Sequence, residues 1–221
     1  MQKAADLRVQ KTQEAIRNTL LNLIEEKGFD SITVHDLCQR ARINRSTFYS
    51  HYRDKYNLLE KITKEAIGEI LHVVNPETIV DGCGKIDLSA YRSMVLSLLV
   101  TIQRDRLIYK TLLGVNGNYS FLKELKAVVE EKIFREWRSL HPDATSYPIS
   151  ENLYLEIIVS IYVGTILWWI DRDFAPSPEQ VAEQLVRYIV FGTSLVADFK
   201  PPSRSEFPFL YDKADKLSGK W

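Results

Sequence analysis

The chain has 221 residues, of which 45% are hydrophobic, and its 29 basic and 29 acidic residues balance. This composition is typical of a globular protein with a sizeable core and excludes a low-complexity or strongly charged disordered chain. The two cysteines, Cys38 and Cys83, offer no disulfide framework or metal-ligand spacing, and the polar N-terminus is not a signal peptide. We therefore expect a cytoplasmic protein without a metal or cofactor.

The first predicted helix covers residues 8–27, where apolar side chains recur at helical spacing. Gly28 follows it as a residue suited to the left-handed conformation that ends many helices. Residues 1–61 carry 11 Lys and Arg against 8 Asp and Glu, whereas the remainder carries 18 against 21. A basic N-terminal part on a neutral chain is typical of a nucleic-acid-binding module joined to something else.

Two short helices joined by a tight turn are predicted at residues 33–41 and 45–52. Thr33 is suited to cap the first helix, with Asp36 returning the bond three residues later. Asn44 is suited to cap the second by accepting from the backbone N–H of Ser46 or Thr47. In the second helix Phe48 and Tyr52, four residues apart, share the face that we expect to be buried.

The opposite face of that second helix offers a cation, two hydroxyls, a phenol and an imidazole, which suit base edges and phosphates in a major groove. We expect Tyr49 and Lys55 to hold phosphates, because Lys55 begins the next helix, where backbone N–H groups favour an anion. The sequence leaves open which neighbouring side chain reads a base. The full set of predicted DNA contacts is Thr33, Arg42, Asn44, Arg45, Ser46, Thr47, Tyr49, His51 and Lys55.

This stretch resembles the DNA-binding domain of the TetR family of transcriptional regulators. The residues that carry the resemblance are Gly28-Phe29, Thr33-Val34, Leu37-Cys38, Ala41, Ile43-Asn44, Phe48-Tyr49, His51-Tyr52, Lys55 and Leu58. One departure is Arg42, which stands where the family usually has glycine. If this position has a positive φ, the arginine costs about 1 kcal/mol of strain and adds a cation at the DNA face. The resemblance also implies that Lys11 or Thr12 approaches a phosphate.

After Lys55 we predict helices at residues 55–74, 87–104, 107–113 and 120–140, with a Pro- and Gly-containing loop at 75–85. Tyr56, Leu59, Ile62 and Ile70 are assigned to the inner face of the first of these. By resemblance, that helix transmits effector binding to the DNA-binding helices. Two interpretations of the aromatic residues remain open, plain core or the wall of a small-molecule pocket, and the predicted wall is Tyr91, Met94, Tyr109 and Trp137.

Two apolar helices are predicted at residues 149–173 and 177–199. The apolar run 153–170 nearly reaches the length of a membrane span, but it contains Glu156 and is followed by acids, so a buried helix is favoured. In the TetR family the last two long helices form a four-helix bundle with a second subunit. The residues predicted at that interface are Tyr162, Gly164, Trp168, Leu185, Ile189, Gly192 and Val196. The phrase W-W-I-D-R-D-F-A-P-S-P-E-Q-V-A also resembles a TetR subgroup from low-GC Gram-positive bacteria.

Together these features predict an all-α protein with a DNA-binding domain at residues 1–65, a regulatory and dimerisation domain at 66–199 and a tail at 200–221. The resemblance implies a ligand-responsive repressor that binds a palindromic operator in double-stranded DNA as a homodimer, with a small-molecule effector and no membrane partner. The alternative is a helical interaction protein without sequence-specific DNA binding. An enzyme is disfavoured, because the four histidines lack metal-site spacing and no nucleophile motif occurs.

Overall fold

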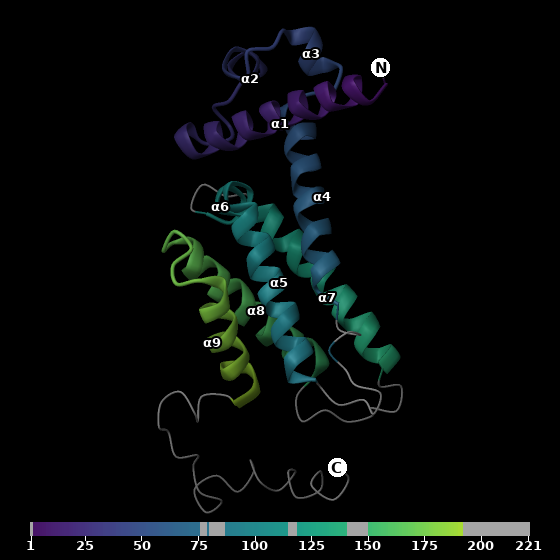
Figure 1. Cartoon of the computed structure of the whole chain (residues 1–221), viewed down its shortest axis with the longest axis vertical. Helices are drawn as coiled ribbons and strands as arrows, with labels where there is room; N and C mark the ends of the chain where they lie inside the picture. Colours follow the sequence, from purple (N-terminus) through teal and green to yellow (C-terminus); the bar gives the residue numbers. More distant parts are fainter. Residues whose placement is uncertain (1, 76–78, 80–86, 115–118, 141–149, 192–221) are drawn as a thin grey trace, which may run out of the picture.

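The computed structural model describes residues 2–75, 79, 87–114, 119–140 and 150–191, and the regular elements of these ranges are helices (Figure 1). The all-α prediction is confirmed. The N-terminal helices are α1 (Gln2–Lys27), α2 (Val34–Arg40), α3 (Arg45–Tyr49) and α4 (Lys55–Val73). Those that follow are α5 (Leu88–Arg104), α6 (Arg106–Leu113), α7 (Tyr119–Leu140), α8 (Glu151–Ile170) and α9 (Pro178–Phe191).

The first three helices form one end of the molecule, with α2 and α3 lying across α1 (Figure 1). Their shared core contains Ile16, Leu20, Leu37 and Phe48, all fully buried. Gly28 has φ 74° and ends α1 as predicted, because only glycine adopts that conformation without strain. The largest differences from the predicted boundaries are that α1 begins at residue 2 rather than 8, α3 ends at 49 rather than 52 and α8 ends at 170 rather than 173.

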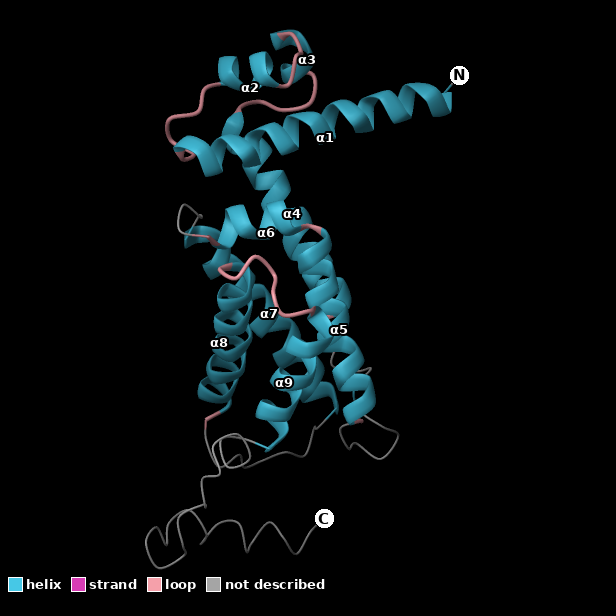
Figure 2. Ribbon diagram, turned by 60° about the vertical axis from the view of Figure 1, so that its left-hand side comes forward, coloured by secondary structure: helices cyan, strands magenta, loops and turns pink. Residues whose placement is uncertain are grey.

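Helix α4 runs from beneath this end into the rest of the molecule, where it contacts α5, α6 and α7 (Figure 2). The carboxylate of Asp54 caps it by accepting from the backbone N–H of Asn57 at 2.7 Å. Ile62 and Ile70 are buried, as predicted. Tyr56 was assigned to the same inner face, and that assignment is wrong, because its side chain is 62% exposed.

The remaining helices form a bundle in which α9 packs along α5 and α8 packs against α7 (Figure 2). Local caps mark the starts of these helices. Asp87 accepts from two backbone N–H groups of α5, Ser150 accepts from Leu153 N–H, and Ser177 accepts from Gln180 N–H. The part of the predicted helix 177–199 that follows residue 191 lies outside the described residues.

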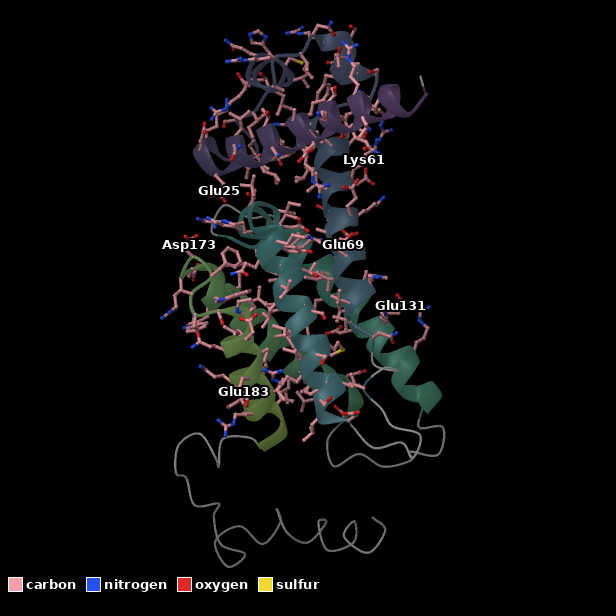
Figure 3. All side chains as sticks on the ribbon, viewed as in Figure 1. Glu25, Lys61, Glu69, Glu131, Asp173 and Glu183 are labelled. Atoms are coloured by element: carbon pink, nitrogen blue, oxygen red, sulfur yellow. The ribbon has the colours of Figure 1, made fainter. Side chains whose placement is uncertain are left out.

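The short helix α6 joins the two ends of the molecule. On one side, the Thr111 hydroxyl donates to Glu25 of α1 at 3.3 Å, and Figure 3 shows Glu25 on the underside of α1. On the other side, the hydroxyl of Tyr109 donates to the Ala66 carbonyl of α4 at 3.1 Å. Burial raises the pKa of Tyr109 well above its usual value, so the phenol stays protonated and keeps donating.

Candidate nucleic-acid interface

The start of α2 is fixed by a reciprocal capping box. The Thr33 hydroxyl accepts from the backbone N–H of Asp36 at 3.2 Å, and the Asp36 carboxylate accepts from the backbone N–H of Thr33 at 2.9 Å. Lys27 of α1 donates to the same carboxylate at 2.9 Å. These bonds, that of the Thr33 backbone first, lower the pKa of Asp36 well below its usual value. Both predicted capping roles are confirmed, and the Thr33 side chain points toward the start of α2.

The turn after α2 is closed by two backbone hydrogen bonds. The N–H of Arg42 donates to the Gln39 carbonyl at 3.3 Å, and the N–H of Ile43 donates to the Cys38 carbonyl at 3.0 Å. This pair of bonds is the Schellman pattern, in which the residue after the cap adopts the left-handed conformation. Arg42 occupies that position with φ 54°, so the positive φ considered from the sequence is present.

Asn44 organises the start of α3. Its side-chain oxygen accepts from the backbone N–H of Thr47 and from the hydroxyls of Ser46 and Thr47, each at 2.7 Å. Because the backbone N–H can only donate, it identifies the acceptor as the amide oxygen of Asn44. Both hydroxyls therefore donate their hydrogens to Asn44, and their oxygens remain available as acceptors.

The two faces of α3 separate as predicted. Phe48 is fully buried and Tyr52 is 8% exposed, and their rings lie 5.8 Å apart in the shared core. Tyr49 is 56% exposed, and Arg45 and Ser46 are also exposed. His51 follows the helix and is half-buried, with its ring 6.2 Å from that of Tyr52. These outward groups lie at the end of the molecule shown uppermost in Figure 3.

Several cations near this surface are already engaged. Arg40 donates twice to Glu26, Arg17 pairs with Glu65, and Lys61 donates to the His51 carbonyl. A cation held in this way contributes less to an incoming anion, because its present partner must first be given up.

Lys55 makes contacts within the subunit that the sequence did not indicate. Its ammonium donates to the carbonyls of Phe29 and Asp30, at 3.0 and 2.9 Å, and lies 4.7 Å from the centre of the Phe29 ring. The side chain thus ties the start of α4 to the loop after α1. Two of its three donors are used within the subunit, and the contact of Lys55 with a phosphate stays a prediction.

Among the described side chains of residues 7–65, five cations make neither a hydrogen bond nor an ion pair: Arg8, Lys11, Arg42, Arg45 and Arg53. Arg8 and Arg53 were not predicted as site residues. The excess of basic residues at the N-terminal end could have indicated a DNA-binding surface there, but it does not show which of the cations are left unpaired. The described residues contain no group of His, Cys, Asp and Glu arranged to hold a metal.

Two of the four residues predicted to line an effector pocket are buried. Tyr109 is 1% exposed beneath α4 and Tyr91 is buried, whereas Met94 is half-buried. The Tyr91 hydroxyl is 2.7 Å from that of Tyr162 on α8. The side chain of Trp137 lies outside the described residues. The burial of Tyr91 and Tyr109 favours the plain-core interpretation for these two residues, and the pocket wall stays a prediction.

An exposed apolar face runs along α8 and α9. Leu153, Ile157 and Trp168 of α8 and Tyr188 of α9 are all substantially exposed. The two helices flank an open groove of about 970 Å³ that includes Gly164, where an added Cβ would meet no atom within 4 Å. No described helix is long and apolar enough to cross a membrane.

The predicted dimer residues divide between this face and the interior. Gly164 and Trp168 are on the exposed face and Ile189 is half-buried. Tyr162 is half-buried with its hydroxyl 2.7 Å from that of Tyr91 on α5, and Leu185 is 4% exposed but lines the groove; their place at a dimer interface stays a prediction. Gly192 and Val196 lie outside the described residues.

Models of regulator families match both the N-terminal and the C-terminal parts of the chain. The family model "Bacterial regulatory proteins, tetR family" matches residues 16–62, and the model "Transcriptional regulator C-terminal region" matches residues 90–190. The uncharacterized HTH-type transcriptional regulator YxbF of Bacillus subtilis is 23% identical over 85% of this chain, which spans only 47% of YxbF. DhaS of Lactococcus lactis, an HTH-type dhaKLM operon transcriptional activator, is 22% identical over 56% of this chain and 61% of its own.

Solved structures show the same fold. A TetR transcriptional regulator from Streptococcus agalactiae aligns over 86% of this chain and 99% of its own, with a TM-score of 0.58 and 23% identity. A TetR-family regulator from Syntrophomonas wolfei aligns over 84% and 95%, with a TM-score of 0.60 and 15% identity. Because the capped helix-turn-helix and both family models agree, the chain belongs to the TetR family of transcriptional regulators and carries that family's DNA-binding helix-turn-helix.

Proposed function

We propose that this protein is a cytoplasmic, ligand-responsive repressor that binds a palindromic operator as a homodimer. Residues 1–65 serve as the DNA-binding domain and residues 66–199 as the regulatory and dimerisation domain, followed by a tail at 200–221. The observation that carries the proposal is the outward face of α3, where Asn44 fixes two hydroxyls beside the unpaired Arg45.

Base readout is assigned to Arg45, Ser46 and Thr47. An arginine recognises guanine through its O6 and N7 acceptors. The hydroxyl oxygens of Ser46 and Thr47 are left as acceptors, so they suit the amino groups of adenine or cytosine. We therefore expect each half-site to contain a guanine next to a base that presents an amino group in the major groove.

Phosphate contacts are assigned to Tyr49 and His51; Asn44 positions α3, and Thr33, whose N–H and hydroxyl both donate to Asp36, positions α2. Tyr49 projects from the recognition helix with 56% of its surface exposed. Lys55 supports the interface from behind by holding the loop after α1. In this arrangement base readout sets the sequence, whereas phosphate contacts set register and affinity.

Dimerisation is assigned to the exposed face of α8 and α9, centred on Gly164 and Trp168. Several large apolar side chains share this face, and the glycine permits close approach of a second helix. A two-fold dimer presents two copies of α3, so the operator is expected to have two half-sites on one face of the duplex.

A small molecule acts only if it binds the DNA-competent and released states with different affinity. Of the described residues predicted to line the pocket, Tyr91 and Tyr109 are buried, and Met94 on α5 is half-buried. An effector could therefore reach Met94 without first displacing the core. The contacts of α6 with both α1 and α4 give such a change a route to the DNA-binding end.

Selection from a random library of DNA duplexes, repeated at several salt concentrations, tests the proposal. We expect an enriched palindrome whose affinity falls steeply with salt. Arg45→Ala should weaken binding to it by about 1–3 kcal/mol and relax the preference at one position of each half-site. Arg135→Ala on α7, which removes another exposed cation, one that pairs with Glu131 far from α3, is the control and should bind normally.

Salt-dependent binding with no enriched sequence would contradict sequence-specific recognition, and an absence of binding at low salt would favour the helical interaction protein. The sign of regulation needs a separate measurement, because the relative DhaS is described as an activator. A reporter placed behind the selected operator should be expressed more strongly when the protein is deleted. Lower expression on deletion would make this protein an activator.

A further inference from the structure

The turn between α2 and α3 contains a residue whose backbone conformation favours glycine. Arg42 has φ 54°, and the left-handed region costs a residue with a Cβ about 1–2 kcal/mol relative to ordinary backbone. Glycine satisfies the same Schellman hydrogen bonds without that cost. The protein is therefore less stable with arginine at this position than it would be with glycine, and backbone strain of this kind is found mostly at functional sites.

Within the subunit the Arg42 side chain has no visible use. It is exposed, and among the described residues it makes no hydrogen bond or ion pair. Arg40, two residues earlier, provides the contrast, because its guanidinium is held by Glu26 through two hydrogen bonds. Of these two neighbouring arginines, only Arg42 has a guanidinium that is available to an anion outside the chain.

The surroundings of Arg42 are suited to a linear anion. Ala41 and Ile43, on either side of it, line an open hollow of about 440 Å³ whose opposite wall is the N-terminal half of α1. That wall carries Arg8 and Lys11, both of which are exposed and unpaired. Arg8 and Lys11 thus line one side of a shallow hollow, and Arg42 lies between the two residues that line the other side, directly before α3. The hollow is too open to enclose a small molecule.

We propose that Arg42 is retained in its strained conformation because its guanidinium neutralises the DNA backbone where a strand passes along this hollow, opposite Arg8 and Lys11. The contact is sequence-independent and separate from base readout by α3. This inference rests on the proposed DNA-binding function and adds a specific claim: residue 42 exchanges subunit stability for affinity. A glycine here would make the protein more stable and a weaker binder.

Three substitutions separate strain from charge. Arg42→Gly removes both, Arg42→Ala keeps the strain and removes the charge, and Arg42→Lys keeps both. We expect Arg42→Gly to raise the midpoint of thermal unfolding by about 2–4 °C, with the other two near the wild type. We expect Arg42→Gly and Arg42→Ala alike to lower the log–log salt slope of operator binding by about one per subunit, and Arg42→Lys to preserve it.

The result that would overturn the inference is an Arg42→Gly protein that binds with wild-type affinity and salt slope. A weakening confined to particular base pairs would also overturn it, by making Arg42 a base reader. Failure of the underlying function looks different, because the wild-type protein itself would then show no salt-dependent binding to any duplex. If the wild type selects a palindrome and the three variants bind equally, only the assignment of Arg42 fails.

Discussion

Trp168 offers the most direct test of dimerisation through α8 and α9. Its side chain is 39% exposed in the subunit, although tryptophan usually contributes its large surface to a core or an interface. A residue surface of roughly 250 Å² leaves about 100 Å² available to a partner. At about 25 cal/mol per Å², covering that area contributes up to ~2.5 kcal/mol for each subunit.

A two-fold interface contains the contact twice, so Trp168→Ala is expected to weaken the dimer by up to about 5 kcal/mol. That figure corresponds to a rise of roughly three to four orders of magnitude in the dissociation constant. Sedimentation equilibrium over a wide range of protein concentration measures the constant. The fold of the subunit should persist, because the fully buried ring in this region is that of the neighbouring Trp169.

The matched control is Tyr56→Ala, which removes another exposed aromatic ring beside a cation but lies in the first turn of α4, away from α8 and α9. It should leave the dimer unchanged. The reasoning would be refuted if Trp168→Ala dimerised as tightly as the wild type, or if Tyr56→Ala weakened the dimer to the same extent. Either result would move the interface away from the exposed face of α8.

Three further predictions concern the contacts that hold the DNA-binding end. Asn44→Ala should lower stability by about 1 kcal/mol by removing the cap of α3, and Asn44→Asp should restore thermal stability but not DNA binding, because it brings a negative charge to the phosphates. Tyr109→Phe should cost about 0.5–1.5 kcal/mol in chemical denaturation, since its hydroxyl donates to the buried Ala66 carbonyl; an unchanged midpoint would show that the bond contributes nothing. The pKa of the Asp36 carboxyl is lowered, first by the hydrogen bond from the Thr33 backbone N–H. The ionised carboxylate therefore stabilises the fold above about pH 4, and this stabilisation is lost as pH falls toward the folded-state pKa. Asp36→Asn should accordingly make the free energy of unfolding fall less steeply as the pH is lowered.

The features that sequence reasoning identified correctly are those fixed by near neighbours. The capping box of Thr33 and Asp36, the cap at Asn44 and the left-handed Gly28 each depend on residues at most a few positions apart. The burial of Phe48 follows from its spacing along a short helix. Such interactions leave a strong local signal, because the backbone geometry at a helix end admits few residue types.

The contacts that the sequence did not indicate join residues far apart in the chain. Lys55 faces the carbonyls of Phe29 and Asp30, 26 and 25 residues earlier, and no local pattern indicates that choice. The Tyr162 hydroxyl lies 2.7 Å from that of Tyr91, which is 71 residues away. Helical spacing shows which residues share a face, but it does not show which neighbouring element covers that face.

The position of α6 has a consequence for exchanging parts between related regulators. This short helix binds Glu25 of α1 through Thr111 and α4 through Tyr109, so the DNA-binding end is attached by a side contact as well as by the continuous chain. A chimaera made by joining a foreign DNA-binding module within α4 would keep the chain connection and lose the side contact. We expect such hybrids to fold yet respond poorly to an effector unless residue 25 and its α6 partner are transferred together.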